Sequence, residues 1–264
     1  MSALLRQTRP LRSLPSFTPS RPRPLPRNFY PRTQIPPRPR LSRSYETNPF
    51  ASHEKANMRV LYALMAVNVS VFGYAIYVRE AARQGNKQPW LHFIRNMSLN
   101  LDDVRQGHWW LLFTSTFTHI DLSHIFSNLF TVFFLGRFLA RHPIITPTRY
   151  FVIAMGSGLS GSFGWLANRY AQERNPLSRK YVRGLGFSGV VMGISSVAAC
   201  LMPSAKVHLY GIIPVPMWAL VAGYAAYDGY YLNDETSKVG HAGHLGGSAF
   251  GIVYYFTRLR GLRF

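Results

Sequence analysis

Four polar side chains with the potential for acyl-transfer chemistry lie within apolar stretches of the sequence. Ser188 stands between two glycines in GFSGVVMG, His244 lies in HAGHLGG, and His124 and Asn128 are the ends of HIFSN. A serine hydroxyl becomes a useful nucleophile when a base such as histidine takes its proton, and the developing oxyanion needs hydrogen-bond donors. Together the four predict a serine hydrolase site, although Ser188 alone would also fit a small residue that lets two helices touch.

His124 and Asn128 are four residues apart, so a helix places both side chains on one face, one turn apart. Both side chains can donate hydrogen bonds. In hydrocarbon an unpaired amide or imidazole is costly, so each group needs a partner or a function. Either residue alone would fit a hydrogen bond between helices, whereas the pair also fits the donors of an oxyanion hole.

Ser188 and His244 are 56 residues apart, so their contact has to be inferred from the surrounding pattern. Small residues spaced three or four apart let helix backbones approach closely in a membrane. Glycines recur in this way around both residues: Gly184, Gly186, Gly189 and Gly193 near the serine, and Gly240, Gly243, Gly246, Gly247 and Gly251 near the histidine. We therefore expect the two segments to pack together and to bring the imidazole within reach of the hydroxyl.

The elements that must position these groups are apolar segments of membrane-spanning length. Hydrophobic residues make up 47% of the 264 residues and charged residues only 15%, and a span needs about 20 mostly apolar residues. A soluble bundle of such helices would lack a polar face for water. The sequence therefore predicts an all-α membrane protein with six spans, at 58–78, 119–140, 150–168, 185–202, 207–231 and 241–257.

Two of the six segments carry residues that are unusual in a span. The second contains His119 and Asp121, and polar groups at such depth usually face a cavity or the bundle interior. The fifth contains Pro214 and Pro216. Cys200 is the single cysteine of the chain, which excludes an intrachain disulfide and a cysteine metal site.

The positive charge is concentrated near the N-terminus. The formal net charge is +20, and residues 1–45 supply half of it, with ten Arg, ten Pro and no Asp, Glu or Lys. The other basic residues lie mostly between apolar segments and form no surface stripe, so we expect no nucleic-acid partner. MSALLRQTRPLRSL, residues 1–14, has the arginine-rich, acid-free composition of a mitochondrial transit peptide.

The domain organisation follows from these composition shifts. Residues 1–45 are predicted to be a transit peptide with a disordered Pro/Arg-rich spacer, 46–57 a linker, 58–258 the membrane domain and 259–264 a short basic tail. Arg43-Ser44-Tyr45 resembles the pattern cut by matrix processing peptidases, which would leave a chain starting at Glu46. The alternative is a disordered basic tail on a protein of another intracellular membrane.

Three motifs together resemble the rhomboid intramembrane serine proteases, over about residues 58–258. They are HIFSN in the second segment, GFSG in the fourth and HLGGSAFG in the sixth, in the order that the family shows. The passage HAGHLGGSAFGIVYY is similar to mitochondrial rhomboids of the presenilin-associated kind, which agrees with the transit-like N-terminus. The resemblance implies a six-span rhomboid core in the mitochondrial inner membrane.

The resemblance also implies catalytic roles. Ser188 would be the nucleophile and His244 the base, with no buried Asp in use, no metal and no cofactor. His124, Asn128 and the backbone N–H of Ser188 would form the oxyanion hole. The substrates of this family are single-pass transmembrane proteins within the lipid bilayer, and the site would open to the face that bears the long first loop.

Supporting roles follow from the same resemblance. Gly247 and Gly251 would let the sixth span approach the fourth, Gly186 would belong to the serine motif, and His119 would help to hold the loop over the site. Phe187 and the residue one turn after the serine, Met192, depart from residues common in the family.

Several alternatives stay open at this point. His241, one turn before His244, is a rival base, although only His244 has the family's His-x-x-Gly spacing. The main alternative function is a catalytically inactive rhomboid-like protein that binds or escorts membrane clients, but such relatives usually lose the serine or the histidine. A transporter would predict an internal repeat and broken helices, which the sequence does not display.

Overall fold

The computed structural model describes residues 49–173, 182–209, 211–234, 236–237 and 239–262. The transit peptide, the proline-rich spacer and the cut after Tyr45 therefore lie outside the described residues. Their assignment remains a prediction from the sequence.

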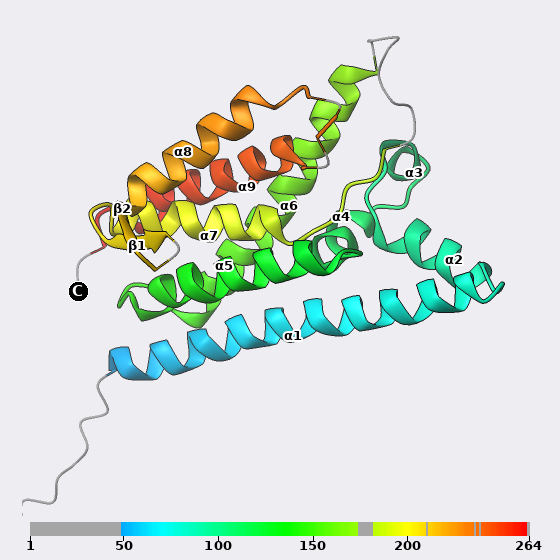
Figure 1. The fold of residues 1–264 in the computed structure, drawn as a ribbon. Coiled ribbons are helices and arrows are strands. Elements are labelled where there is room, and N and C mark those ends of the chain that lie inside the picture. The colour runs from blue at the N-terminus through cyan, green and yellow to red at the C-terminus, as the bar shows by residue number, and fades with distance from the viewer. Residues whose placement is uncertain (1–48, 174–181, 210, 235, 238, 263–264) are drawn as a thin grey trace, which may run out of the picture. The chain divides into compact units, whose positions relative to one another are not determined.

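A helix lies in each of the six segments that the sequence singles out (Figure 1), but the last three helices have only 14 residues each, so the count of six spans stays a prediction. Two of the helices in the described part of the chain are long and apolar enough to cross a membrane, over His53–Arg83 and Leu122–Arg141, and Ser188–Leu201 is apolar but shorter. The helices are α1 (Pro49–Arg83), α5 (Leu122–Arg141), α6 (Pro147–Gln172), α7 (Ser188–Leu201), α8 (Met217–Tyr230) and α9 (His241–Tyr254), which continues as the π-helical turn η2 (Tyr255–Leu259).

The prediction of a helix from residue 207 is wrong, although the fold is mostly helical, as the all-α prediction requires. Strand β1 (Lys206–Leu209) pairs with β2 (Ile213–Pro216) in an antiparallel hairpin, and α8 begins only at Met217. Pro214 and Pro216 explain this, because a proline inside a helix removes a hydrogen bond and clashes with the preceding turn. The fifth helix is therefore 14 residues long.

The segment predicted to be a linker, 46–57, is helical from Pro49 onward. Asn57 is fully buried in α1, and its side-chain amide donates to the backbone carbonyls of Ala140 at 2.9 Å and Ile145 at 2.7 Å. These bonds tie the first half of α1 to the turn that follows α5, so this part of the segment belongs to the folded domain.

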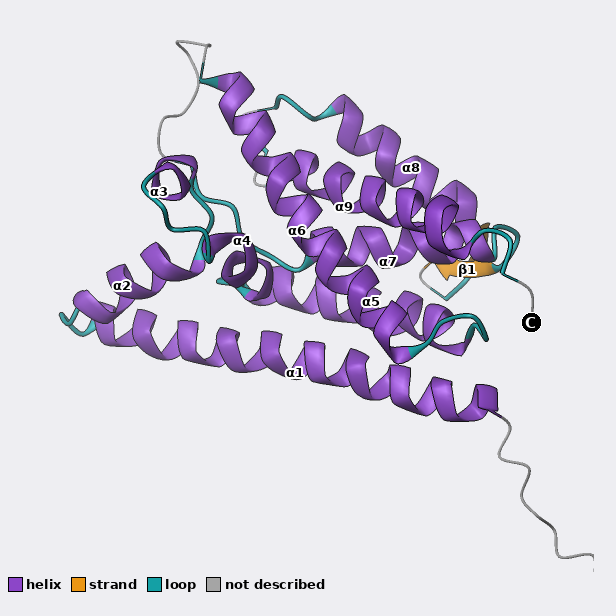
Figure 2. Cartoon of the chain, turned by 180° about the vertical axis from the view of Figure 1, so that it is seen from behind, coloured by secondary structure: helices purple, strands orange, loops and turns teal. Residues whose placement is uncertain are grey.

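The helices pack in an order that differs from their order in the chain (Figures 1 and 2). α9 lies against α6 and α7, α5 packs on α7, and α1 covers α5 from outside, whereas α8 packs on α9 and α7. The main core lies between these helices and includes Leu61, Leu139, Tyr150, Ile194 and Met217, each at most 1% exposed. The chain enters α5, α7 and α9 at the same end of the bundle (Figure 1).

The long connection between α1 and α5 folds beside that end. It contains α2 (Gln88–Met97), α3 (Leu101–Arg105), α4 (Leu111–Thr114) and the 3-10 turn η1 (Ser115–Phe117). Its surface exposes Trp109, Trp110 and Phe113, as expected for a segment at a membrane interface. The connection supplies the contacts that hold the chain leading to Ser188.

Candidate active site

The backbone that leads into Ser188 is held by the first loop. Leu99 and Gly184 exchange two backbone hydrogen bonds of 2.8 Å in an isolated antiparallel bridge. The Arg183 guanidinium donates to a carboxylate oxygen of Asp103 at 2.7 Å; the Asp103 side chain is largely buried, whereas that of Arg183 is about a third exposed. This clamp fixes the approach to the serine from two sides.

Gly186 turns the chain toward α7 in a conformation that suits glycine. Its φ is +127°, and its N–H donates to the Ser115 carbonyl at 2.9 Å. A Cβ at this position would lie 2.7 Å from Cε1 of His124, so a side chain would meet both backbone strain and the imidazole. The supporting role predicted for Gly186 thus has a local physical basis.

Ser188 is the first residue of α7 and is only partly buried. The first backbone N–H groups of a helix have no partner within the helix, and they concentrate the positive end of its dipole there. Phe187, just before it, is fully buried, and its ring lies 5.8 Å from that of Phe117. The Phe187 side chain therefore packs into the core next to the start of α7.

Glycines bring α7 and α9 into backbone contact. A Cβ on Gly247 would overlap the carbonyl oxygen of Gly189, and one on Gly251 would overlap that of Gly193. A Cβ on Gly189 would lie 3.5 Å from the carbonyl oxygen of Gly243. The first turns of the two helices, which carry Ser188 and His244, therefore adjoin each other.

His244 faces a buried carboxylate that the sequence reading left out. Nδ1 of His244 lies 3.0 Å from Oδ1 and 3.2 Å from Oδ2 of Asp228 in α8, whose side chain is 2% exposed. The family resemblance implies a site in which no buried Asp is used, yet a buried Asp lies against the predicted base. Its signal in the sequence was a lone acid, Asp228, inside the fifth apolar segment.

His241, the rival base, contacts the same carboxylate. Its Nδ1 lies 2.7 Å from Oδ1 of Asp228, and its Nε2 lies 2.9 Å from the hydroxyl of Ser237. Both ring nitrogens of His241 are thus engaged, and its side chain is 2% exposed, against 18% for His244. This arrangement favours His244 over His241 as the more accessible base.

The same three side chains have the donor set of a cation site. One ligand atom from each of Asp228, His241 and His244 lies within 4.8 Å of the others, and imidazole and carboxylate suit zinc. Hydrogen bonds already pair these atoms with one another, which accounts for the cluster without an ion.

The predicted oxyanion donors, His124 and Asn128, lie in α5, near the chain that precedes Ser188. The ring of His124 lies beside Gly186, where it would meet an added Cβ. The Asn128 amide donates to the backbone carbonyl of His124 and to Nε2 of His119, both at 3.1 Å. Both amide hydrogens are thus engaged, so Asn128 has to exchange a partner before it can donate to an oxyanion.

His119, for which the resemblance implies a role in holding the loop over the site, connects the chain before Ser188 with Asn128. Its Nε2 accepts the N–H of Phe187 at 3.2 Å in addition to the Asn128 amide. Nε2 can accept these bonds only when it carries no proton, so the ring acts here as a neutral imidazole. His119 thereby fixes the residue before Ser188 and orients Asn128.

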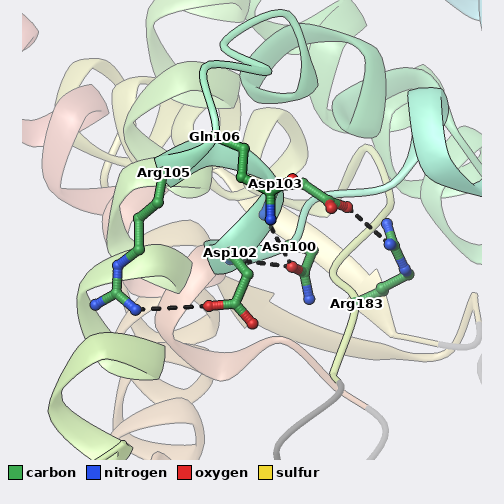
Figure 3. A pocket seen from close by; sticks show the side chains of 6 residues that line it. All are labelled: Asn100, Asp102, Asp103, Arg105, Gln106 and Arg183. Carbon is green, nitrogen blue, oxygen red and sulfur yellow. Dashed lines mark hydrogen bonds and ion pairs between the residues drawn. The ribbon is translucent and has the colours of Figure 1, made fainter.

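A polar cleft of about 490 Å³ lies beside the first loop (Figure 3). Its lining comes from α3 and its flanks together with the chain before Ser188, and consists of Asn100, Asp102, Asp103, Arg105, Gln106 and Arg183. None of the predicted catalytic residues lines it. Its side chains mainly pair with one another, as the dashed lines in Figure 3 show, so the cleft marks the clamp and not the reaction site.

The fold and these motifs define a class of protein. The chain belongs to the rhomboid family, since the Rhomboid domain model matches residues 106–261. Members of this family are generally intramembrane serine proteases that act on membrane proteins within the bilayer.

Comparison with individual proteins narrows the class to mitochondrial rhomboids. The chain is 31% identical to RHOMBOID-like protein 12, mitochondrial, of Arabidopsis thaliana over 65% of its own length and 52% of the relative. It is 28% identical to Rhomboid protein 1, mitochondrial, of Saccharomyces cerevisiae over 78% and 54%. For the human Presenilin-associated rhomboid-like protein, mitochondrial, the identity is 26% over 53% and 35%.

The chain thus spans about half the length of its plant and yeast relatives. The apolar helices and the mitochondrial relatives together identify the chain as a mitochondrial membrane protein of the rhomboid family.

Proposed function

We propose that this rhomboid is an active serine endopeptidase of the mitochondrial inner membrane that cleaves single-pass transmembrane proteins. The observation that carries the proposal is the glycine contact between α7 and α9, which joins the helix turns that bear Ser188 and His244. Nucleophilic acyl transfer needs a base within reach of the serine hydroxyl, and the packing of these two helix turns supports such a pairing.

The reaction would proceed through an acyl-enzyme. The Ser188 oxygen attacks the scissile carbonyl carbon while its proton passes to Nε2 of His244, and that proton then goes to the leaving amine as the C–N bond breaks. A water molecule then gives a proton to His244 and attacks the ester carbonyl. The ester C–O bond breaks, the Ser188 oxygen takes the proton back, and the new carboxyl terminus is released. No metal or cofactor takes part in these steps.

The oxyanion would be stabilised from two sides. The N–H of Ser188 and the positive end of α7 lie on one side, and the His124 ring lies beside Gly186 on the other. Asn128 would join when the substrate draws its amide away from His119, to which it is bonded without substrate.

Cleavage of a transmembrane reporter in proteoliposomes tests the proposal. We expect the wild-type chain to cut it and Ser188→Ala and His244→Ala to lose at least about 1000-fold in kcat. Folded wild-type protein that binds the reporter without cutting it would favour an inactive client-binding rhomboid instead. Cutting that persists in both variants would place the active site elsewhere.

A further inference from the structure

The steps above do not use the buried carboxylate of Asp228. It lies in α8, is 1% exposed and is surrounded by the otherwise uncharged sequence MWALVAGYAAYDGY. A buried carboxylate without hydrogen-bond donors costs several kcal/mol. Asp228 meets this cost through the two imidazoles at the start of α9, at 2.7 Å and 3.0 Å.

An ionised carboxylate only accepts hydrogen bonds, so it dictates where both histidines carry their protons. Each imidazole must donate from Nδ1, which leaves Nε2 of a neutral ring as an acceptor. For His241 this agrees with the Ser237 hydroxyl at Nε2, which can donate to it. For His244 it leaves Nε2 unprotonated, as a base for Ser188 requires.

We propose that Asp228 is a positioning residue for the reaction, acting through His244. It holds the imidazole as the Nδ1–H tautomer and stabilises the imidazolium that forms when the Ser188 proton reaches Nε2. Asp228 stays ionised throughout, so the proton moves only between Ser188, His244 and the leaving amine. This inference rests on the proposed protease function and adds a third member to its serine–histidine pair.

The competing explanation is that Asp228 merely ties α8 to α9. His241 provides the means to separate the two roles, because it holds the shorter hydrogen bond to the same oxygen and is not the base. If the carboxylate served only as a tie, breaking its bond to His241 would cost as much activity as removing its charge. If it acts on the base, only loss of the charge has a large effect on kcat.

The experiment compares Asp228→Asn with His241→Phe, which keeps an aromatic ring but removes the donor to Asp228. In the reporter assay we expect Asp228→Asn to lower kcat by at least about 100-fold with KM within about threefold of wild type. We expect His241→Phe to keep kcat within about fivefold. Thermal unfolding of both variants checks that each is folded at the assay temperature.

A second pair covers the case in which Asp228→Asn does not fold. Asp228→Glu keeps the charge, and Asp228→Gln is its uncharged match of equal length, so the account expects at least about tenfold higher kcat in the Glu variant. Equal kcat in these two, or equal losses in Asp228→Asn and His241→Phe, would overturn the positioning role.

Failure of this inference can be told apart from failure of the proposed function. Wild type that cuts, Ser188→Ala that does not and Asp228→Asn at near wild-type kcat would leave the protease standing and remove Asp228 from its mechanism. Wild type that does not cut would remove both.

Discussion

At the scale of single residues, the site depends on side chains that constrain one another. His119 accepts from both the Phe187 backbone and the Asn128 amide, and it can do so only as a neutral ring. Gly186 lies where any side chain would press on His124. The backbone that leads into Ser188 is therefore fixed by its neighbours in the absence of substrate.

We predict that Gly186→Ala destabilises the loop by about 1–3 kcal/mol, since alanine is strained at φ +127° and its Cβ would meet His124. Reporter cleavage should fall at least about tenfold. Gly73→Ala is the matched control, because Gly73 lies in the exposed helix α1 with nothing within 4 Å, and it should keep full activity. If Gly186→Ala cleaved the reporter at the wild-type rate, the prediction that a side chain at this position is strained and disturbs the site would be wrong.

At the scale of elements, the contact between α7 and α9 decides whether the two halves of the site meet. That contact leaves no room for side chains at the glycines where backbone faces backbone. The first loop adds a second constraint, since Asp103 and Leu99 hold the chain that enters α7.

Gly247→Ala should push α9 away from Gly189, lower stability by about 1–3 kcal/mol and reduce kcat more than about 100-fold. Gly223→Ala in α8, where nothing lies within 4 Å, should have no such effect. Thermal unfolding and the reporter assay measure both. Equal behaviour of the two variants would show that the close approach is not needed.

Loss of the Arg183–Asp103 ion pair should lower cleavage activity less than Gly247→Ala does. Arg183→Gln is expected to lower stability by about 1–2 kcal/mol, because it leaves the largely buried Asp103 without its partner. It should reduce kcat several-fold by loosening the chain before the serine. Arg105→Gln breaks a solvent-exposed ion pair with Glu173 at 2.7 Å and should change little. If Arg105→Gln lowered stability and cleavage more than Arg183→Gln, the proposed role of the Arg183–Asp103 pair would be wrong.

The helices are easier to predict from the sequence than the contacts between side chains of different elements. Apolar length is a local property, so each of the six predicted segments contains a helix, and Pro214 and Pro216 argue against a helix where the β-hairpin forms. The link between Asp228 and His244 depends on how α8 packs against α9, which no local pattern fixes. The engaged state of Asn128 likewise depends on where the loop places His119.

At the scale of the whole molecule, the described helices form a membrane domain, whereas the arginine-rich N-terminus is predicted to be a mitochondrial transit peptide. The chain enters α5, α7 and α9 at one end of the bundle, beside the first loop (Figure 1). The site should therefore open to one face of the membrane only, and if the N-terminus stays in the matrix, that face is the intermembrane space.

We predict that import into mitochondria removes residues 1–45, so that the mature chain starts at Glu46. N-terminal sequencing of the protein recovered from mitochondria checks this. Arg43→Ala should shift or abolish the cut, whereas Arg21→Ala, an equal loss of charge far from the site, should not. An intact N-terminus in the mitochondrial protein would contradict the transit-peptide prediction.

The most direct test of the central claim is to map the adduct of a serine-directed fluorophosphonate on the protein in lipid. Attack by an activated serine oxygen displaces fluoride and leaves a phosphonyl group on that oxygen. The account predicts a single adduct on Ser188 in the wild type, lost in Ser188→Ala and strongly reduced in His244→Ala. An adduct on another residue, or labelling of Ser188 that does not depend on His244, would contradict it.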